Sequence, residues 1–325
     1  MLQRGRRLRV SDGIRRMVRE TGIRTSALIL PLFIKEGTGV NEQIESLPGH
    51  RYYSPDNVVE GIADAVEHGL NSVLLFGLPN GKDELATGAY ADDGVVQKAI
   101  RAIKAYNKNI VVITDVCLCE YTANGHCGMV CHGDVLNDET LPLLAKTALS
   151  HAQAGADIVA PSDMMDGRVA AIRECLDEHG FTSVGILSYA VKYSSSFYAP
   201  FRDVAASAPT FGDRKTYQMD WHNRREGMKE AVQDLCEGAD MLMVKPAMTY
   251  LDIISDVKKA TNVPVCAYSV SGEYAMIKAA AKYGCIDEYA VMCETSVAVF
   301  RAGADLLITY YAKELAGAIR RGDIG

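Results

Sequence analysis

The chain has 325 residues, a formal net charge of −7 and nine cysteines. This acidic balance disfavours a general nucleic-acid binder, whose affinity comes mostly from cationic contacts to phosphates. The longest apolar run, residues 27–34, is too short to span a bilayer. An odd number of scattered cysteines in so long a chain does not suit a disulfide framework, so we expect a reducing, cytoplasmic location, a small-molecule partner, and neither a nucleic-acid nor a membrane partner.

The first 20 residues form a basic stretch ahead of the first predicted strand. Seven arginines stand there against two acidic residues, Asp12 and Glu20. An organelle presequence is one interpretation of such a stretch. The two acids and the continuous run into the fold favour instead an ordered N-terminal arm over residues 1–25.

Eight short runs of apolar and β-branched residues predict strands that are buried on both faces, as in a parallel sheet. They lie at residues 26–34, 72–78, 109–118, 156–162, 183–191, 241–247, 263–271 and 305–311. Apolar spacings of three and four residues predict helices at about 55–68, 92–107, 138–153, 166–179, 223–237, 250–260, 273–302 in pieces, and 312–320. Eight strand–helix units favour one α/β domain, a (β/α)8 TIM barrel over residues 26–325. A doubly wound open sheet is the alternative.

Reactive side chains follow these predicted strands at one end. In a (β/α)8 barrel the active site lies at the carboxyl ends of the strands. The residues in question are Asp115, Cys117 and Cys119 after the third strand, Ser162 and Asp163 after the fourth, Lys192 after the fifth, Lys245 on the sixth, Ser271 after the seventh and Tyr310 on the eighth. We therefore expect all of them to face one mouth of the barrel.

Residues 115–128, DVCLCEYTANGHCG, hold three cysteines, a histidine and two carboxylates. Zinc binds thiolates strongly, and three protein ligands with an open fourth position are typical of a catalytic zinc site. Cys117, Cys119 and Cys127 supply three thiolates, and a turn at Gly125 would bring the third one back. The alternatives are no metal, or a structural site closed by Cys131, His126 or His132.

Two lysines stand at strand ends amid apolar sequence, Lys192 in LSYAVKY and Lys245 in MVKPAM. Lysine is rarely buried without a partner or a task. If the two ammonium groups share a pocket of low dielectric, each disfavours the charge on the other, and a neutral amine becomes available to attack a ketone. The pattern predicts Schiff-base chemistry. The alternative is that either lysine pairs with a carboxylate at the rim.

Residues 193–221, the lid segment, show little helical or strand periodicity and are rich in tyrosine and basic residues. A long segment of this kind is more typical of an active-site lid than of a passive connection. Arg202 and Arg214 would bind a substrate carboxylate through paired donors. The alternative is a solvated, charged loop.

Several long motifs resemble the porphobilinogen synthase family, also called 5-aminolevulinate dehydratase, and together they cover nearly the entire chain. They are LILPLFIKEG (28–37), SLPGHRYYS (46–54), DVCLCEYTANGHCG (115–128), APSDMMDGRV (160–169), SYAVKYSSSFYAPFRD (188–203), GDRKTYQMD (212–220), MVKPAMTYLDI (243–253), YSVSGEYAMIK (268–278) and RAGADLLITYY (301–311). The resemblance implies a (β/α)8 barrel with an N-terminal arm, commonly assembled as a homo-octamer. The implied reaction condenses two 5-aminolevulinate molecules into porphobilinogen with loss of two waters, in tetrapyrrole biosynthesis.

The same resemblance assigns roles to the reactive residues. Lys245 matches the lysine that forms a Schiff base with the first substrate, and Lys192 matches the lysine that engages the second. The first substrate's carboxylate would be held by Ser271 and Tyr310, and the second's by Arg202, Arg214 and Gln218.

The three thiolates resemble those of zinc-type members of the family, in contrast to members that replace the cysteines and depend on magnesium. Zinc on Cys117, Cys119 and Cys127 would act on the second substrate as a Lewis acid, or by binding its amino group or a hydroxide. Asp115 and Asp163 are the candidates for proton transfer, supported by Ser162. Glu230 matches an acid that holds an activating, allosteric magnesium in many members; the alternative is a solvated helix residue.

Three positions depart from the family pattern. Asn124 replaces the histidine of TSHGHCG, which weakens any supporting role of a histidine beside the metal. Ala199 replaces the glycine of FYGPFRD, which would stiffen the lid segment. Cys131 is an additional cysteine that could offer a fourth thiolate. None of the three removes a residue with an assigned chemical role.

Two other functions are compatible with parts of this pattern. A class I aldolase on a similar barrel also uses a lysine Schiff base but needs only one lysine and no thiolate metal site. A barrel stabilised by zinc and serving only in assembly or binding would keep the cysteines but would not need reactive residues at several strand ends.

Overall fold

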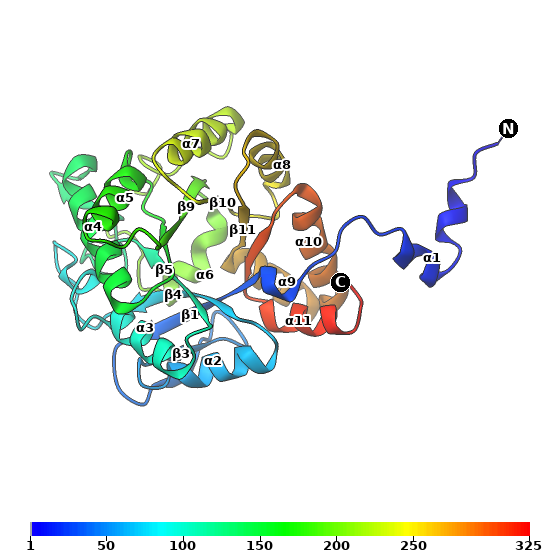
Figure 1. The fold of residues 1–325 in the computed structure, drawn as a ribbon, viewed down its shortest axis with the longest axis horizontal. Helices are drawn as coiled ribbons and strands as arrows, with labels where there is room; N and C mark the ends of the chain where they lie inside the picture. Colours follow the sequence, from blue (N-terminus) through cyan, green and yellow to red (C-terminus); the bar gives the residue numbers. More distant parts are fainter. Residues whose placement is uncertain (1) are drawn as a thin grey trace.

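Eight parallel strands close into a barrel in the computed structural model, which describes residues 2–325 (Figure 1). Strand β1 pairs with β4 on one side and with β12 on the other, and this second pairing closes the sheet. In barrel order the strands are β1 (Leu28–Lys35), β4 (Ser72–Leu78), β5 (Val111–Val116), β8 (Ile158–Pro161), β9 (Gly185–Lys192), β10 (Met241–Lys245), β11 (Val265–Ser269) and β12 (Leu306–Thr309). The predicted TIM barrel is confirmed, and the closure excludes a doubly wound open sheet.

Helices follow the strands and surround the barrel in Figure 1. They are α2 (Val58–Glu67), α3 (Val95–Tyr106), α4 (Asn137–Ala154), α5 (Arg168–Glu178), α7 (Arg224–Cys236), α8 (Leu251–Ala260), α9 (Ser271–Lys282), α10 (Glu288–Ala302) and α11 (Ala312–Arg320). The predicted pieces within 273–302 are α9 and α10, which are separated by a turn where Gly284 has a φ of +69°. Within residues 2–325, every helix is too short or too polar to cross a bilayer.

The strands are buried almost continuously, as expected for strands covered by helices on one face and by the barrel interior on the other. Strand β9, for example, is buried along its length from Ile186 to Lys192. Burying one large aliphatic side chain contributes about 1.5–3 kcal/mol. This apolar framework supports the polar groups at the strand ends.

Three features were absent from the sequence-based prediction. The short strands β2 (Asn41–Gln43) and β3 (Arg51–Tyr53) form an antiparallel pair, as do β6 (Met129–Cys131) and β7 (Asp134–Leu136). Strands of three residues are too short to show a two-residue period. The lid segment is not structureless, because it contains a 3-10 turn at Ser196–Tyr198 and the helix α6 (Ala199–Val204), which has a proline in its first turn.

The N-terminal stretch projects away from the barrel in Figure 1. It contains a 3-10 helix at Gly5–Arg9 and the short helix α1 (Asp12–Met17), and neither includes a buried residue. Large apolar side chains are exposed there, including Leu2 at 68% and Met17 at 76%. The chain joins the barrel near Ile23, whose amide donates to the carbonyl of Ile324 at 3.1 Å. The role of residues 1–25 in assembly stays a prediction.

Candidate active site

Lys192 and Lys245 are direct neighbours across two strands. Lys192 ends β9, Lys245 ends β10, and the two are register partners in the parallel pairing. Side chains of paired residues in adjacent strands project to the same face of a sheet. Both ammonium groups lie over one ring, that of Tyr189, at 5.1 Å for Lys245 and 5.6 Å for Lys192. The two amines therefore share one pocket at the carboxyl end of the barrel.

A bulge in β9 turns Lys192 into this pocket. Between two successive paired positions, β10 advances by two residues, from Leu242 to Val244, whereas β9 advances by three, from Ser188 to Val191. Strand β9 therefore contains one extra residue. Ser188 faces outward, because its hydroxyl donates to Asp234 of α7 at 2.5 Å. In a regular strand, residues 188 and 192 would point to the same face. The extra residue reverses the alternation, so Lys192 points inward beside Lys245, as bulges near active sites often re-aim a side chain.

Aromatic rings enclose the Lys245 ammonium group. Its Nζ lies 4.5 Å from the ring centroid of Tyr268, 5.1 Å from that of Tyr198 and 5.4 Å from that of Phe201. Burial, and secondarily the charge of Lys192, lower the pKa of Lys245 to about 7. A substantial fraction of this amine is therefore neutral near neutral pH, which is the condition for nucleophilic attack on a ketone. The sequence prediction did not include these rings.

Asp115, near the end of β5, lies close enough to Lys192 and Lys245 for their charges to act on its pKa. Asp115 accepts a hydrogen bond from the Ser162 hydroxyl at 3.0 Å on one oxygen, while its other oxygen, Oδ1, is buried without a partner. Burial, and then the charge of Glu120, raise the pKa of Asp115 to about 7. Lys192 donates to the backbone carbonyl of Ser162. Asp115 is therefore placed to exchange a proton near neutral pH.

Asp163 follows Ser162 in the loop after β8 and is fully buried. Its Oδ1 accepts from the Met165 amide at 2.7 Å, and its Oδ2 is buried without a partner. Burial raises the pKa of Asp163 to about 6, against the opposing charge of Arg168. Arg168 is itself buried and paired with Asp234 at 2.5 Å. The predicted pair of carboxylates is thus present with perturbed proton affinity.

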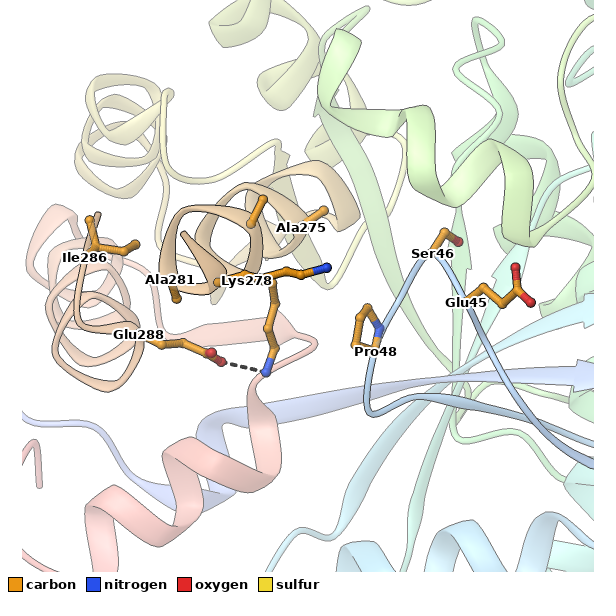
Figure 2. A pocket seen from close by; sticks show the side chains of 10 residues that line it. Glu45, Ser46, Pro48, Ala275, Lys278, Ala281, Ile286 and Glu288 are labelled. Carbon is orange, nitrogen blue, oxygen red and sulfur yellow. Dashed lines mark ion pairs between the residues drawn. The ribbon is translucent and has the colours of Figure 1, made fainter. Parts of the chain in front are cut away.

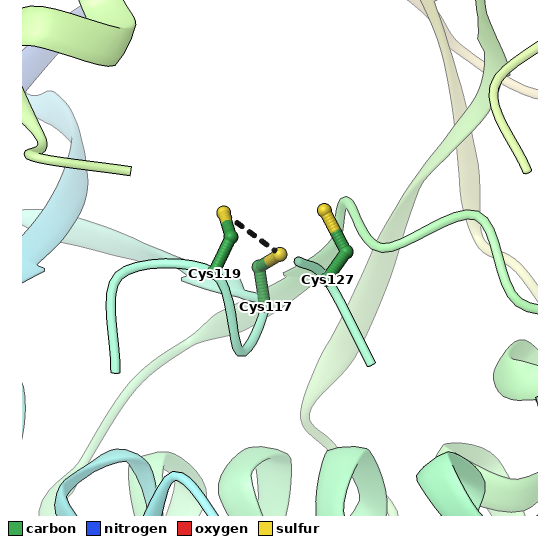
Figure 3. A group of neighbouring side chains, drawn as sticks. All are labelled: Cys117, Cys119 and Cys127. Carbon is green, nitrogen blue, oxygen red and sulfur yellow. Dashed lines mark hydrogen bonds between the residues drawn. The ribbon is translucent and has the colours of Figure 1, made fainter. Parts of the chain in front are cut away.

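The thiols of Cys117, Cys119 and Cys127 lie close together, as Figure 3 shows, and all three belong to the loop between β5 and β6. The sulfur atoms of Cys117, Cys119 and Cys127 all lie within 4.8 Å of one another, and the Cys117 thiol donates to Cys119 at 3.3 Å. Gly125 has a φ of +71°, a conformation that glycine adopts without strain, and it turns the chain so that Cys127 returns. The neighbouring Cys117 and Cys119 thiols hold the pKa of Cys127 well below its ordinary value.

This donor set fits zinc with three protein ligands. The further cysteine and histidines that would close a structural site do not join the cluster within residues 2–325. Cys131 is exposed, and both ring nitrogens of His126 are engaged by the lid segment. Glu120 was missed as a site residue, although it follows the CLC motif directly. It is buried, accepts from the Cys119 thiol at 3.2 Å, and has a pKa raised by burial.

Three polar residues of the lid segment carry buried side-chain atoms that lack hydrogen-bond partners among residues 2–325. Nε of Arg202, Nε of Arg214 and both amide atoms of Gln218 are buried without hydrogen-bond partners. Buried polar atoms normally have partners, so a cluster of exceptions points to a missing ligand. The charge of Arg214 also helps to lower the pKa of the half-buried Arg202, after burial itself. Together these donors suit an anionic group such as a carboxylate.

Ser271 and Tyr310 lie on the Lys245 side of the pocket. The Ser271 hydroxyl accepts from the amide of Phe201 at 3.0 Å, so it contacts the lid segment. The hydroxyl of Tyr310 lies 3.4 Å from that of Tyr268, one of the rings around Lys245. The structure thus brings the predicted residues from β5, β8, β9, β10, β11 and β12 to one end of the barrel.

Glu230 lies elsewhere, on the outer helix α7. It lines a hollow of about 370 Å³ together with Asp166 and Glu226. Burial, and then the charge of Asp234, raise the pKa of Glu230. An accumulation of carboxylates is common without a bound cation, so the role of Glu230 stays a prediction.

A larger hollow, of about 700 Å³, lies outside the barrel between α9, α10 and the loop at residues 45–48 (Figure 2). Two of its charged residues, Lys278 and Glu288, form an ion pair at 2.6 Å. None of the predicted site residues lines it. The candidate active site is therefore the barrel mouth and not this hollow.

Known proteins resemble this chain over nearly its full length. A family model described as delta-aminolevulinic acid dehydratase matches residues 2–318. Relatives of that name from Halalkalibacterium halodurans and Synechocystis sp. are 53% and 55% identical, and the alignments cover 97% and 96% of this chain and 96% and 97% of the relatives. A solved structure of delta-aminolevulinic acid dehydratase from Toxoplasma gondii, in complex with the reaction product porphobilinogen, has a TM-score of 0.95 at 43% identity, covering 98% of this chain and 91% of that one.

Proposed function

The chain belongs to the delta-aminolevulinic acid dehydratase family, hydro-lyases that make porphobilinogen for tetrapyrrole biosynthesis, and we propose that it works through two lysine Schiff bases beside a thiolate-bound zinc ion. The observation that carries this mechanism is the adjacency of Lys192 and Lys245 at the ends of β9 and β10. Two neighbouring amines suit a reaction that must activate two ketones in one pocket.

Lys245 captures the first 5-aminolevulinate molecule. Its neutral amine adds to the ketone carbon, the carbonyl oxygen leaves as water with the two amine hydrogens, and a C=N bond replaces C=O. The lowered pKa of Lys245, caused by burial and by Lys192, supports this role. Ser271 and Tyr310 hold the carboxylate of this substrate from the side of β11 and β12.

Lys192 activates the ketone of the second molecule in the same way. The carboxylate of this substrate binds to Arg202, Arg214 and Gln218, whose buried unpaired donors support the assignment. Asp115 and Asp163 move protons between the bound molecules, since burial raises both pKa values toward neutrality. When the ring is complete, both lysines are released, and the balance is two substrates to one product and two waters.

Cys117, Cys119 and Cys127 hold the zinc ion. When bound there, zinc supplies a Lewis acid next to the second substrate. Buried thiols clustered within 4.8 Å of one another support this, because thiolates are favoured zinc ligands. Hydrogen bonding with the Cys117 and Cys119 thiols holds the pKa of Cys127 below its ordinary value, which favours the thiolate form that zinc binds.

Turnover with and without chelator tests the proposal directly. Purified protein supplied with 5-aminolevulinate is expected to form porphobilinogen, because both amines and both carboxylates are in place. Prolonged treatment with a zinc chelator should abolish product formation, and added zinc should restore it, as followed by a colorimetric pyrrole assay. Full activity in protein shown by elemental analysis to be free of zinc would overturn the metal assignment but leave the lysine chemistry standing.

Assembly and magnesium form a second part of the proposal. Residues 1–25 serve as an arm that contacts other copies in a homo-octamer, which the exposed apolar side chains Leu2, Leu8 and Met17 support. Glu230 binds an activating magnesium ion in the hollow beside α7, which the neighbouring Glu226 and Asp166 support.

Sedimentation velocity tests both assignments. The full chain is expected to form a larger assembly than a chain lacking residues 1–25, because removal of the arm removes its exposed apolar contacts. Magnesium is expected to favour the larger assembly of the full chain but to have no effect on a Glu230→Gln variant. Equal sedimentation of the full and shortened chains would refute the arm, and an unchanged magnesium response in the variant would refute the ion site.

A further inference from the structure

The loop that carries the third thiol is hydrogen-bonded to the lid segment through residues 124–127. We call residues 117–127 the metal loop. Its Asn124 carbonyl accepts from the Thr210 amide at 2.9 Å, and its Gly125 carbonyl accepts from Nη2 of Arg214, also at 2.9 Å. A side chain at Gly125 would collide with the lid, because an added Cβ would lie 2.4 Å from the Ala208 carbonyl oxygen. The two segments therefore pack backbone against backbone.

His126 lies at the centre of this contact. It is only 2% exposed, and its ring packs on that of Phe211 with centroids 4.4 Å apart. Nε2 lies 3.1 Å from the Phe211 carbonyl oxygen and Nδ1 lies 3.0 Å from the Tyr217 hydroxyl. A carbonyl oxygen only accepts, so Nε2 carries a proton; in the neutral imidazole with this tautomer, Nδ1 accepts from the tyrosine hydroxyl.

Tyr217 extends the contact to the metal ligand itself. Its hydroxyl oxygen accepts a long hydrogen bond from the backbone amide of Cys127 at 3.5 Å. A continuous chain of hydrogen bonds thus runs from the amide of Cys127 through Tyr217 and His126 to the lid backbone at Phe211. On the same segment, Arg214 and Gln218 carry buried polar atoms that have no hydrogen-bond partner among residues 2–325.

We propose that His126 and Tyr217 form a latch, a pair of positioning residues that couples the three-thiolate metal site to closure of the lid segment. An ion that draws in the Cys127 thiolate fixes the end of the metal loop, and the latch passes this restraint to the lid segment. Coupling is reciprocal, so a closed lid segment also strengthens metal binding. The inference rests on the proposed function, because the lid segment then closes over the second substrate.

Two variants distinguish the effect of the latch hydrogen bonds from that of ring packing. His126→Phe keeps an aromatic ring against Phe211 but removes both hydrogen bonds, and Tyr217→Phe removes only the hydroxyl. Lys215→Gln serves as the matched control, since Lys215 lies in the same segment, has a side chain that is 70% exposed and, among residues 2–325, forms its ion pair with the neighbouring Asp213 alone. Circular dichroism and thermal unfolding establish that each variant is folded.

Hydrogen exchange of residues 205–218, measured by mass spectrometry with and without zinc, is the decisive readout. In the native chain and in Lys215→Gln, zinc is expected to slow exchange in this segment. In both latch variants zinc still binds, but the slowing is lost, and zinc affinity measured against a competing chelator falls by about 5–150-fold, the usual range of coupling between sites. The KM for 5-aminolevulinate should rise more than kcat falls, because Arg214 and Gln218 are no longer held in place.

Retention of zinc-dependent protection in His126→Phe would overturn the latch, as would a native lid segment that exchanges equally slowly without zinc. This result is independent of the reaction. If the native chain failed to make porphobilinogen, the proposed function would fall, while the exchange experiment would still report whether the metal loop and lid segment are coupled.

Discussion

Replacement of Lys245 by methionine is expected to reduce turnover by about 10⁴-fold or more, as the loss of a covalent nucleophile typically does. Methionine matches the length of the lysine stem but has no amine, so the first Schiff base cannot form. In the native chain, borohydride added with 5-aminolevulinate should reduce the C=N bond and leave a stable adduct on Lys245. Mass spectrometry of the peptide that contains Lys245 measures this adduct, and its absence from active enzyme would refute the mechanism.

Lys192→Met is the matched control for this experiment. It should also make no product, yet it should still be trapped on Lys245, because only the second capture is lost. An adduct that forms on Lys192 alone would reverse the assignment of the two lysines.

The pH dependence of trapping follows from the position of the two amines. The neutral form of Lys245 is the reactive one, so the initial trapping rate should rise about tenfold per pH unit below its pKa of about 7 and level off above it. The Lys192 charge is a secondary cause of the lowered pKa, and its removal in Lys192→Met should move the midpoint to higher pH. A midpoint that stays in place would mean that the two amines do not interact.

The position of the residues at the strand ends was predictable, because all strands of a parallel barrel end at the same rim. Residues that follow successive strands, such as Asp115 and Lys245, must meet at one rim once the sheet closes. Lys192 was assigned to the same rim, but simple alternation from the outward Ser188 would have placed it on the outer face. The bulge that corrects this has no local sequence signal, because β9 reads as a continuous apolar run.

Side-chain contacts between segments that are distant in the sequence could not be predicted from the sequence. Glu120 lies next to a predicted ligand, but its burial depends on how the metal loop packs under the lid segment. The tyrosine rings around Lys245 come from β9, the lid segment and β11, and the apolar patterns of β9 and β11 do not distinguish Tyr189 and Tyr268 from ordinary core residues. Helix α6 was missed because its single turn and a half is too short to show periodicity.

Replacement of Cys119 by alanine is expected to remove zinc and to reduce turnover by more than about 100-fold, since even changes to residues that only support metal ligands cost 10–100-fold. The cysteine lies on a loop after β5 and not in a barrel strand, so the barrel should remain folded. The free energy of unfolding measured in denaturant should fall by only about 1 kcal/mol, the centre of the range for point substitutions. Elemental analysis and the pyrrole assay measure metal and activity on the same sample.

Cys131→Ala provides the matched control, because this thiol lies four residues beyond Cys127 but is exposed and outside the three-sulfur cluster. It should retain zinc, activity and stability. Loss of zinc in Cys131→Ala would identify a fourth thiolate and favour a closed structural site. Unfolding of Cys119→Ala would point the same way, because a metal that the fold requires contributes its binding free energy to folding. A folded, metal-free and inactive Cys119→Ala beside an unaffected Cys131→Ala is the combination that only a three-thiolate catalytic site produces.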